Sequence, residues 1–229
     1  MSALARGLVA VRVGDRHAVR IDSAGLPFIV IAALPSLAAA TFGAGVWAAW
    51  LVALPVAIAL FFRDPDRVSP ADPALVLAPA DGKVTYAGDA RPEEAPEGRW
   101  RQVSIFLSVF DVHVNRTPVG GRVARVERLA GTFLPAYRPA AHRNERSEIW
   151  IDHAGTWVVA RQIVGVLARR VVCRVRPGQV LAPGARIGLM KFGSRMDVFV
   201  PVSADLSVEA GDTVRAGVTV IAMLRRSAS

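Results

Sequence analysis

The stretch that decides the fold is RPGQVLAPGARIGLM, residues 176–190, because it recurs as EAGDTVRAGVTVIAM at residues 209–223. The two segments start 33 residues apart and carry two glycines and a final methionine at equivalent positions. In each, a short apolar run is followed by a glycine-containing turn and a second apolar run, the pattern of a β-hairpin. The repeat therefore predicts two related hairpins of the form strand, turn, strand.

The chain between residue 67 and this repeat has the same character. Its short segments are rich in Val, Ile and Trp and are bounded by Gly, Pro or Asp, and they read RQVSIFLSV, SEIWIDH, TWVVARQIVGVL and RRVVCRVR. No long stretch there has a helical period, so we expect a mainly β fold. With APADGKV, the two hairpins resemble the flattened half-barrels, or barrel-sandwich hybrids, of biotinyl and lipoyl carrier domains. KFGSRMD, residues 191–197, then connects the two repeats.

The N-terminal quarter is different, because residues 23–62 contain no Asp, Glu, Lys, Arg or His. Apolar runs at 26–42 and 45–62 are each near the lower length limit for crossing a bilayer, and GAG between them offers a turn. Arginines flank the pair on both sides, so the positive-inside rule predicts a membrane hairpin that returns to the cytoplasmic face. A cleaved secretory signal is the alternative, since LAAA mimics a cleavage site.

The net charge of +9 comes from 28 basic residues, of which only Lys83 and Lys191 are lysines. No recognition motif or aromatic-interleaved basic patch favours nucleic acid, so anionic lipid is the expected partner. The single Cys173 lies in a strand-like pattern and predicts no disulfide framework. The four histidines are scattered, and no Cys/His cluster predicts a metal site.

Several polar residues have both a structural and a chemical interpretation. Asp81 before glycine is typical of a turn, as is Gly193-Ser194. Alternation along FDVHVN would place Asp111, His113 and Asn115 on one face, which could simply be solvated. NER, residues 144–146, could be a surface loop. No Gly-rich phosphate loop accompanies either lysine, as a pyridoxal phosphate site would need, and FGSRM lacks the second glycine of a nucleophile elbow.

Taken together, these pieces resemble the phosphatidylserine decarboxylase family, in its shorter archaeal and bacterial form. The matching segments are FFRDPDR, APADGKV, FLSVFDVHVNRTPVGG, NER and KFGSRMD, in that order, between about residues 61 and 200. Each fragment alone is weak, whereas five in this order are specific. The family's hairpin is also present in the pattern of this chain.

The resemblance implies that the chain cuts itself between Gly193 and Ser194. Ser194 Oγ would attack the Gly193 carbonyl, and the resulting ester would eliminate to leave dehydroalanine. Tautomerisation and hydrolysis would then release ammonia and leave a pyruvoyl group, the cofactor of this family. That ketone would form a Schiff base with phosphatidylserine and accept the electrons as CO2 leaves, giving phosphatidylethanolamine.

The chain departs from longer family members in two places. Where they have a second histidine, in D-x-H-x-x-H-x-P, this chain has Arg116, and where they have Leu-Gly-Ser-Thr it has Phe-Gly-Ser-Arg. We therefore expect His113 to be the acid and base, oriented by Asp81 or a neighbour. Arg116, which is permanently cationic, is expected to hold the substrate's carboxylate or phosphate, with Asn144, Glu145 and Arg146 as further substrate-binding residues.

The expected organisation is a basic cytoplasmic leader at 1–25, a membrane hairpin at 26–62 and a β-rich catalytic domain at 63–229. Cleavage would give a β chain, 1–193, and an α chain, 194–229, that stay together as a heterodimer or a higher oligomer at the inner membrane. The alternative function is a membrane-tethered carrier domain modified at Lys191, since LMKFG places Met beside that lysine. A membrane scaffold without catalysis would explain the hairpin alone.

Overall fold

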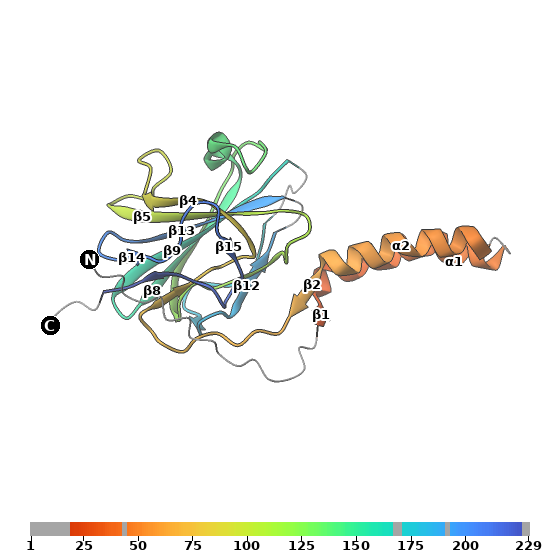
Figure 1. Ribbon diagram of the computed structural model, residues 1–229, viewed down its shortest axis with the longest axis horizontal. Helices are drawn as coiled ribbons and strands as arrows, with labels where there is room; N and C mark the ends of the chain where they lie inside the picture. Colours follow the sequence, from red (N-terminus) through yellow and green to blue (C-terminus); the bar gives the residue numbers. More distant parts are fainter. Residues whose placement is uncertain (1–18, 43–44, 167–170, 191–192, 226–229) are drawn as a thin grey trace, which may run out of the picture.

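The computed structural model describes residues 19–42, 45–166, 171–190 and 193–225, and a helical hairpin projects from a body of strands (Figure 1). The hairpin and its base comprise β1 (Val19–Ile21), η1 (Ser23–Gly25), α1 (Leu26–Thr41), α2 (Gly45–Phe61) and β2 (Arg63–Pro65). The body comprises β3 (Leu75–Leu77), β4 (Gly82–Asp89), β5 (Trp100–Leu107), β6 (Val114–Arg116), β7 (Gly121–Leu129), η2 (Pro139–Arg143), β8 (Arg146–His153), β9 (Thr156–Ile163), β10 (Val172–Cys173), β11 (Val180–Leu181), β12 (Arg186–Leu189), β13 (Ser194–Pro201), β14 (Asp205–Leu206), β15 (Thr213–Val214) and β16 (Val220–Met223).

The main sheet has eight strands in the order β11-β7-β8-β9-β13-β5-β4-β15, and it curls into a half-barrel. Two three-stranded sheets, β10-β12-β6 and β14-β16-β3, complete the body. The strands that pair are antiparallel throughout, and β13 lies near the middle of the main sheet between β9 and β5. The prediction of a mainly β fold is confirmed.

Each copy of the sequence repeat forms the predicted strand, turn and strand, but the prediction of β-hairpins is wrong, because the two strands of a copy pair in different sheets and not with each other. β11 and β12 surround the first turn, and β15 and β16 surround the second. Gly184 and Gly217 both have φ of +70°, a left-handed conformation that favours glycine, and a Cβ atom on either would lie 3.5 Å from the Cα of the other. The first strand of each repeat is an antiparallel edge strand of the main sheet, β11 beside β7 and β15 beside β4, so the repeats supply both of its edges.

One predicted strand is much shorter than its pattern suggested. RRVVCRVR forms only the two-residue strand β10 within the described residues. Just after that strand, the guanidinium of Arg174 binds both oxygens of Asp22 at the base of the hairpin, at 2.6 and 2.5 Å. The backbone N–H of Arg174 still donates to the carbonyl of Ile187, and the ion pair ties this segment to the hairpin.

The core lies on the inner face of the curled sheet. Along β13, Met196 and Val198 point into this core, whereas Arg195 and Asp197 point to the opposite face. That opposite face is also covered, and Arg195 is only 5% exposed. The central strand is therefore buried on both sides, as its continuous burial from Ser194 to Val200 shows.

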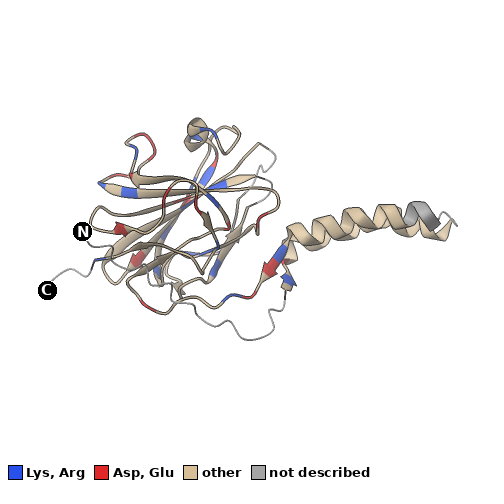
Figure 2. Cartoon of the chain, in the orientation of Figure 1, with Lys and Arg blue, Asp and Glu red and all other residues tan. Residues whose placement is uncertain are grey.

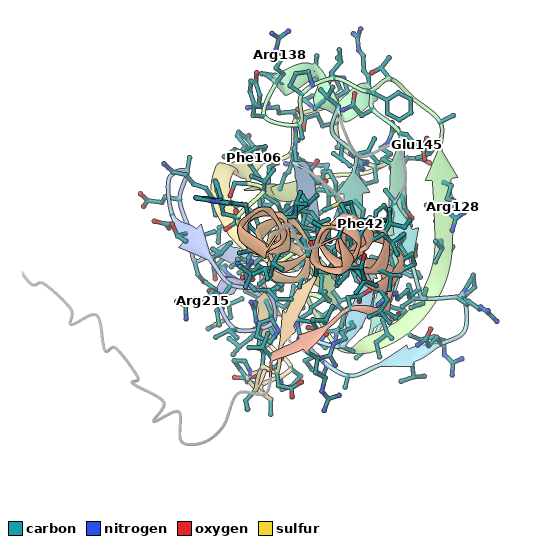
Figure 3. All side chains as sticks on the ribbon, turned by 90° about the vertical axis from the view of Figure 1, so that its right-hand side faces the viewer. Phe42, Phe106, Arg128, Arg138, Glu145 and Arg215 are labelled. Carbon is teal, nitrogen blue, oxygen red and sulfur yellow. The ribbon has the colours of Figure 1, made fainter. Side chains whose placement is uncertain are left out.

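The helices pack side by side, and the chain enters and leaves the hairpin at the same place, because β1 pairs with β2. Figure 2 shows that the described part of the hairpin carries none of the coloured charges, and Figure 3 views it end-on in front of the body, with Phe42 labelled. The helical segment Ser23–Thr41 is long and apolar enough to cross a membrane, with a mean hydropathy of 1.8, and Ala49–Phe61 is a shorter apolar helix. Residues 1–18 of the predicted leader lie outside the described residues.

Candidate active site

The Gly193–Ser194 bond lies where a loop enters the central strand. Gly193 has φ of +63°, in the left-handed region, and Ser194 is the first residue of β13, opposite Leu107 of β5. The serine side chain is fully buried. A hydroxyl in this position is held on a rigid strand directly after a turn, while Lys191 and Phe192 before it lie outside the described residues.

His113 is also completely buried, just before β6. Its Nδ1 donates to the backbone carbonyl of Asp111 at 2.8 Å, so the ring's other nitrogen, Nε2, carries the lone pair. No described residue partners that Nε2. Burial lowers the pKa of His113, and the nearby charge of Asp111 offsets only part of the effect. The ring is therefore a neutral base with a free lone pair, packed 4.0 Å from the Phe61 ring.

Backbone pairing brings His113 close to the cleavage region. The N–H of Met190 donates to the carbonyl of His113, and Val114 pairs with Leu189. Gly193 is three residues beyond Met190, so the chain can carry it at most about 11 Å away. His113 and the Gly193–Ser194 bond thus lie at the same end of the body, near the foot of the hairpin.

Asp81 is placed by contacts to other parts of the chain. Both of its oxygens accept from Arg67, at 2.5 and 2.7 Å, and Oδ1 also accepts from the backbone of Ala216 in the second repeat. Among the described residues no hydrogen bond joins Asp81 to His113, whose Nδ1 is occupied by Asp111. Of the two orienting groups expected for His113, the structure thus shows the neighbour, while Asp81 contributes through its charge.

Arg116 has its partners inside the protein. Its guanidinium donates to Asp64 and to the backbone carbonyls of Pro65 and Gly184, and the residue is 5% exposed. The substrate-binding role expected for Arg116 is therefore at odds with its position. It ties FFRDPDR to the turn of the first repeat, as Arg67 ties the same motif to the second.

The NER segment is split between different tasks. Asn144 is fully buried and uses its amide to hold Thr132, Leu134 and Val164, which fixes the loop before β8. Arg146 contacts Glu148 and the carbonyl of His142. Glu145 is half-buried and lies to the side of the hairpin in Figure 3, with its backbone bonded to Val164. The structure does not gather these three side chains at Ser194.

Known proteins resemble this chain over most of its length. A sequence model described as phosphatidylserine decarboxylase matches residues 56–222. The chain belongs to the phosphatidylserine decarboxylase family. Among its relatives is a phosphatidylserine decarboxylase proenzyme from Geotalea uraniireducens, 39% identical over 206 residues that cover 89% of this chain and 96% of the relative. Proenzymes of the same name from Nitrosomonas eutropha (42% identical; 88% and 94% covered) and Salinibacter ruber (46%; 70% and 73%) also match.

Membership of the phosphatidylserine decarboxylase family leaves the carrier-domain alternative without support. Its modification site, Lys191, lies outside the described residues. The family resemblance on which His113 and Ser194 were selected is confirmed, while the roles of the individual residues stay predictions.

Sequence reasoning missed several residues around this decarboxylase site. Arg67 and Asp64 lie within the quoted FFRDPDR motif, yet only the structure shows that each pairs with a charged residue of a later motif. Gln162 lies near the end of β9, directly after Arg161, and its Nε2 donates to Asn115 Oδ1 at 2.8 Å. A polar pair within a segment rich in Val and Ile was the available signal for Gln162.

Proposed function

We propose that this chain is a proenzyme that cuts itself between Gly193 and Ser194 and then decarboxylates phosphatidylserine to phosphatidylethanolamine and CO2. The observation that carries the proposal is the buried pair of Ser194, next to a left-handed glycine, and His113, with an unpartnered Nε2. The names of the family and of its relatives support the same activity.

His113 is the base for self-cleavage in this proposal. Nε2 takes the proton of Ser194 Oγ, which attacks the carbonyl carbon of Gly193, and the amide nitrogen leaves, so that the peptide bond becomes an ester. Loss of the Ser194 α-proton then breaks the Cβ–Oγ bond and releases Gly193 as a carboxylate. The enamine that remains takes up one water and loses one ammonia. Asp111 and Asp81 favour the charged ring during proton transfer, because their charges raise the His113 pKa.

A pyruvoyl group fits the position of residue 194. The residue begins a strand that is paired on both sides, so the group would be held rigidly, and the lone pair of His113 Nε2 supplies the missing acid and base. When present, the group provides a carbonyl that binds the substrate amine and accepts the electron pair left by CO2. His113, protonated during the reaction, returns a proton to the substrate carbon.

The two products of cleavage stay together in this account. The chain 194–229 begins with β13. This strand is hydrogen-bonded to β5 on one side and to β9 on the other, and both of those strands belong to the chain 1–193. Arg195 adds an ion pair to the buried carboxylate of Glu94. The heterodimer therefore needs no covalent link at the cleavage site. The strand–turn–strand repeat and the curled eight-stranded sheet support a biotinyl- or lipoyl-like half-barrel as the framework of this heterodimer.

In this proposal the hairpin anchors the protein in the inner membrane, with the β body on the cytoplasmic face, and the long apolar helix Ser23–Thr41 supports such an anchor. An open apolar groove of about 710 Å³ lies at the foot of the hairpin, lined by residues that include Phe28, Ile58, Phe61 and Phe110. Phe61 also contacts the His113 ring, so the groove leads from the lipid-facing helices toward the proposed base. A lipid substrate would reach the site without leaving the bilayer.

Replacing Ser194 with alanine tests this function. Ser194→Ala removes both the nucleophile and the atoms that become the pyruvoyl group, so the purified protein should stay one chain and release no CO2 from phosphatidylserine. Ser203→Ala, an exposed serine after β13, is the matched control and should be cut and active. Two chains from Ser194→Ala would rule out this cleavage site.

A further inference from the structure

Three buried polar side chains near the site each have one nitrogen or oxygen atom without a hydrogen-bond partner among the described residues. They are Asn115 through Nδ2, Ser147 through Oγ and Gln162 through Oε1, and each residue is at most 1% exposed. Buried polar atoms are nearly always bonded to protein, water or a ligand. Three such atoms in one place therefore indicate a site for a polar group.

The three side chains are contiguous across three strands. Ser147 of β8 lies directly opposite Gln162 of β9, and Gln162 Nε2 is bonded to Asn115 Oδ1 on β6. A Cβ on Gly188 of β12, which pairs with Asn115, would lie 2.9 Å from Gln162 Nε2, so glycine there makes room for the amide.

The same group lies beside both proposed reacting residues. Gln162 is opposite Met196 of β13, and Ser194 is two residues earlier, on the same face. Such diagonal neighbours are about 7–8 Å apart, within reach of a long side chain. Asn115 follows His113 by two residues. The Asn115–Gln162 bond thus links the segment that carries the base to the strand that carries Ser194.

We propose that Asn115, Ser147 and Gln162 bind the α-amino-acid head of phosphatidylserine. This inference rests on the proposed function. The unmatched atoms are two donors, Asn115 Nδ2 and Ser147 Oγ, which suit a carboxylate, and one acceptor, Gln162 Oε1, which suits the amine.

Neutral donors are also the better choice for a carboxylate that must leave. A cation would stabilise the bound carboxylate more than the transition state, in which its charge moves toward the electron sink, and would slow the reaction. Arg116 and Arg146 are already engaged by Asp64 and Glu148. In the uncut chain the three side chains are as buried as Ser194, so the inference requires the head group to enter after cleavage.

Ser147→Ala tests the inference, because the lost hydroxyl has no hydrogen-bond partner among the residues that the structure describes, so its removal should not lower the melting temperature. The variant should be cut normally. Its KM for phosphatidylserine in mixed micelles should rise by at least about tenfold, as for a lost bond to a charged group. The inhibition constant of phosphatidylethanolamine, which lacks the carboxylate, should not change.

Gln162→Met removes the acceptor for the amine and should weaken the binding of both lipids. Ser104→Ala is the control for losing a buried hydroxyl, since its Oγ accepts from Gln102 on the opposite face of the sheet. Ser104→Ala should lower the melting temperature. It should leave unchanged the ratio of the KM for phosphatidylserine to the inhibition constant of phosphatidylethanolamine.

The inference would be overturned if Ser147→Ala left the ratio of the KM for phosphatidylserine to the inhibition constant of phosphatidylethanolamine unchanged while the wild-type enzyme was active. The proposed function would then stay intact. That result would mean that a buried water binds the unpartnered atoms of Asn115, Ser147 and Gln162. If Gln162→Met does not fold, Ser147→Ala decides alone. A wild-type chain that is neither cut nor active would overturn the proposed function itself, and this inference with it.

Discussion

At the scale of single residues, the site depends on charged and polar groups from distant parts of the sequence. His113 is held by its own neighbour, Asp111, while Asp81 is held by Arg67 and Arg116 by Asp64. The FFRDPDR motif, directly after the hairpin, therefore anchors two later motifs. Its arginine and aspartate bind groups that would otherwise be unpaired in the interior.

The first residue prediction concerns pH. Burial lowers the pKa of His113 below its ordinary 6.5, so the ring keeps its lone pair in the neutral range and is protonated only at lower pH. The rate of self-cleavage, followed on gels during cell-free synthesis, should stay level as pH falls to 6.5 and decrease below it. His113→Ala should be slower by about 10²–10⁴-fold.

The matched control for His113→Ala is His142→Ala. His142 bonds to the carbonyl of Pro139 in the loop before β8, and its loss should change the rate little. Equal rates for the two variants would remove His113 from the mechanism. A decrease in rate that begins above pH 6.5 would contradict the lowered pKa.

A second residue prediction concerns Arg67. Arg67→Ala leaves Asp81 with only the backbone N–H of Ala216, in a place where the aspartate side chain is 14% exposed. Breaking a buried pair in this way should lower the free energy of unfolding by about 3 kcal/mol, measured by denaturant titration in detergent. Arg225→Ala breaks the exposed pair with Asp205 and should have no measurable effect. Similar losses of unfolding free energy from both variants would mean that the buried Arg67–Asp81 pair stabilises the protein no more than the exposed pair does.

At the scale of elements, β13 is buried on both faces and carries different groups on each. Its inner face carries Ser194 and Met196, and its outer face carries Arg195 and Asp197 in an ion network with Glu94. Gln102 and Ser104 of β5 complete that network. The loop that carries Glu94 therefore covers the outer face and fixes the strand that begins at the cleavage site.

The Glu94 network makes stability depend on acid. Burial alone would raise the Glu94 pKa, but Arg195, Gln102 and Arg91 outweigh it and hold the pKa below the ordinary 4.5. The folded state therefore binds this proton less readily than the unfolded state, so its contribution is complete above pH 4.5 and is lost as pH falls through the lowered pKa. Glu94→Gln should lower the melting temperature at neutral pH and flatten its decrease in acid. A wild-type-like acid profile in Glu94→Gln would contradict this assignment.

The local sequence pattern predicted the strands and turns, but it did not predict which distant residues pack against them. The repeat predicted its strands and turns because strand, glycine and strand are local signals, but it did not predict that the two strands of each copy pair in different sheets. Alternation also placed His113 and Asn115 together, yet it offered a solvated face as the simple interpretation. They are buried because Phe61 and Gln162, far away in sequence, cover them. Sequence spacing carries no record of such contacts.

At the scale of the whole molecule, an apolar groove lies where the hairpin meets the body. The ribbon of β1 and β2 holds both ends of the hairpin at the same place, as the flanking arginines predicted. At 1.5 Å per residue, helices of 16 and 17 residues are about 25 Å long, somewhat short of the roughly 30 Å hydrocarbon core. We expect the hairpin to enter the bilayer deeply and return to the side from which it came. The foot of the hairpin then lies at the groove near His113.

Charges on the hairpin should release the protein from membranes. Ile31 and Leu54 are exposed apolar residues on α1 and α2, and Ile31→Glu with Leu54→Glu would place two carboxylates in the hydrocarbon region, each costing up to about 3 kcal/mol. The double variant should move from the membrane pellet to the supernatant and still be cut. Val68→Glu with Val202→Glu, exposed on the body, is the control and should stay in the pellet. Retention of the hairpin variant would mean that another surface anchors the protein.

The most direct test of the central claim is the intact mass of the purified wild-type protein under denaturing conditions. The account predicts two chains, 1–193 and 194–229, with the smaller one beginning in a pyruvoyl group that blocks Edman degradation and reacts with hydroxylamine. A single chain of 229 residues, or a small chain with a free serine at its start, would contradict it.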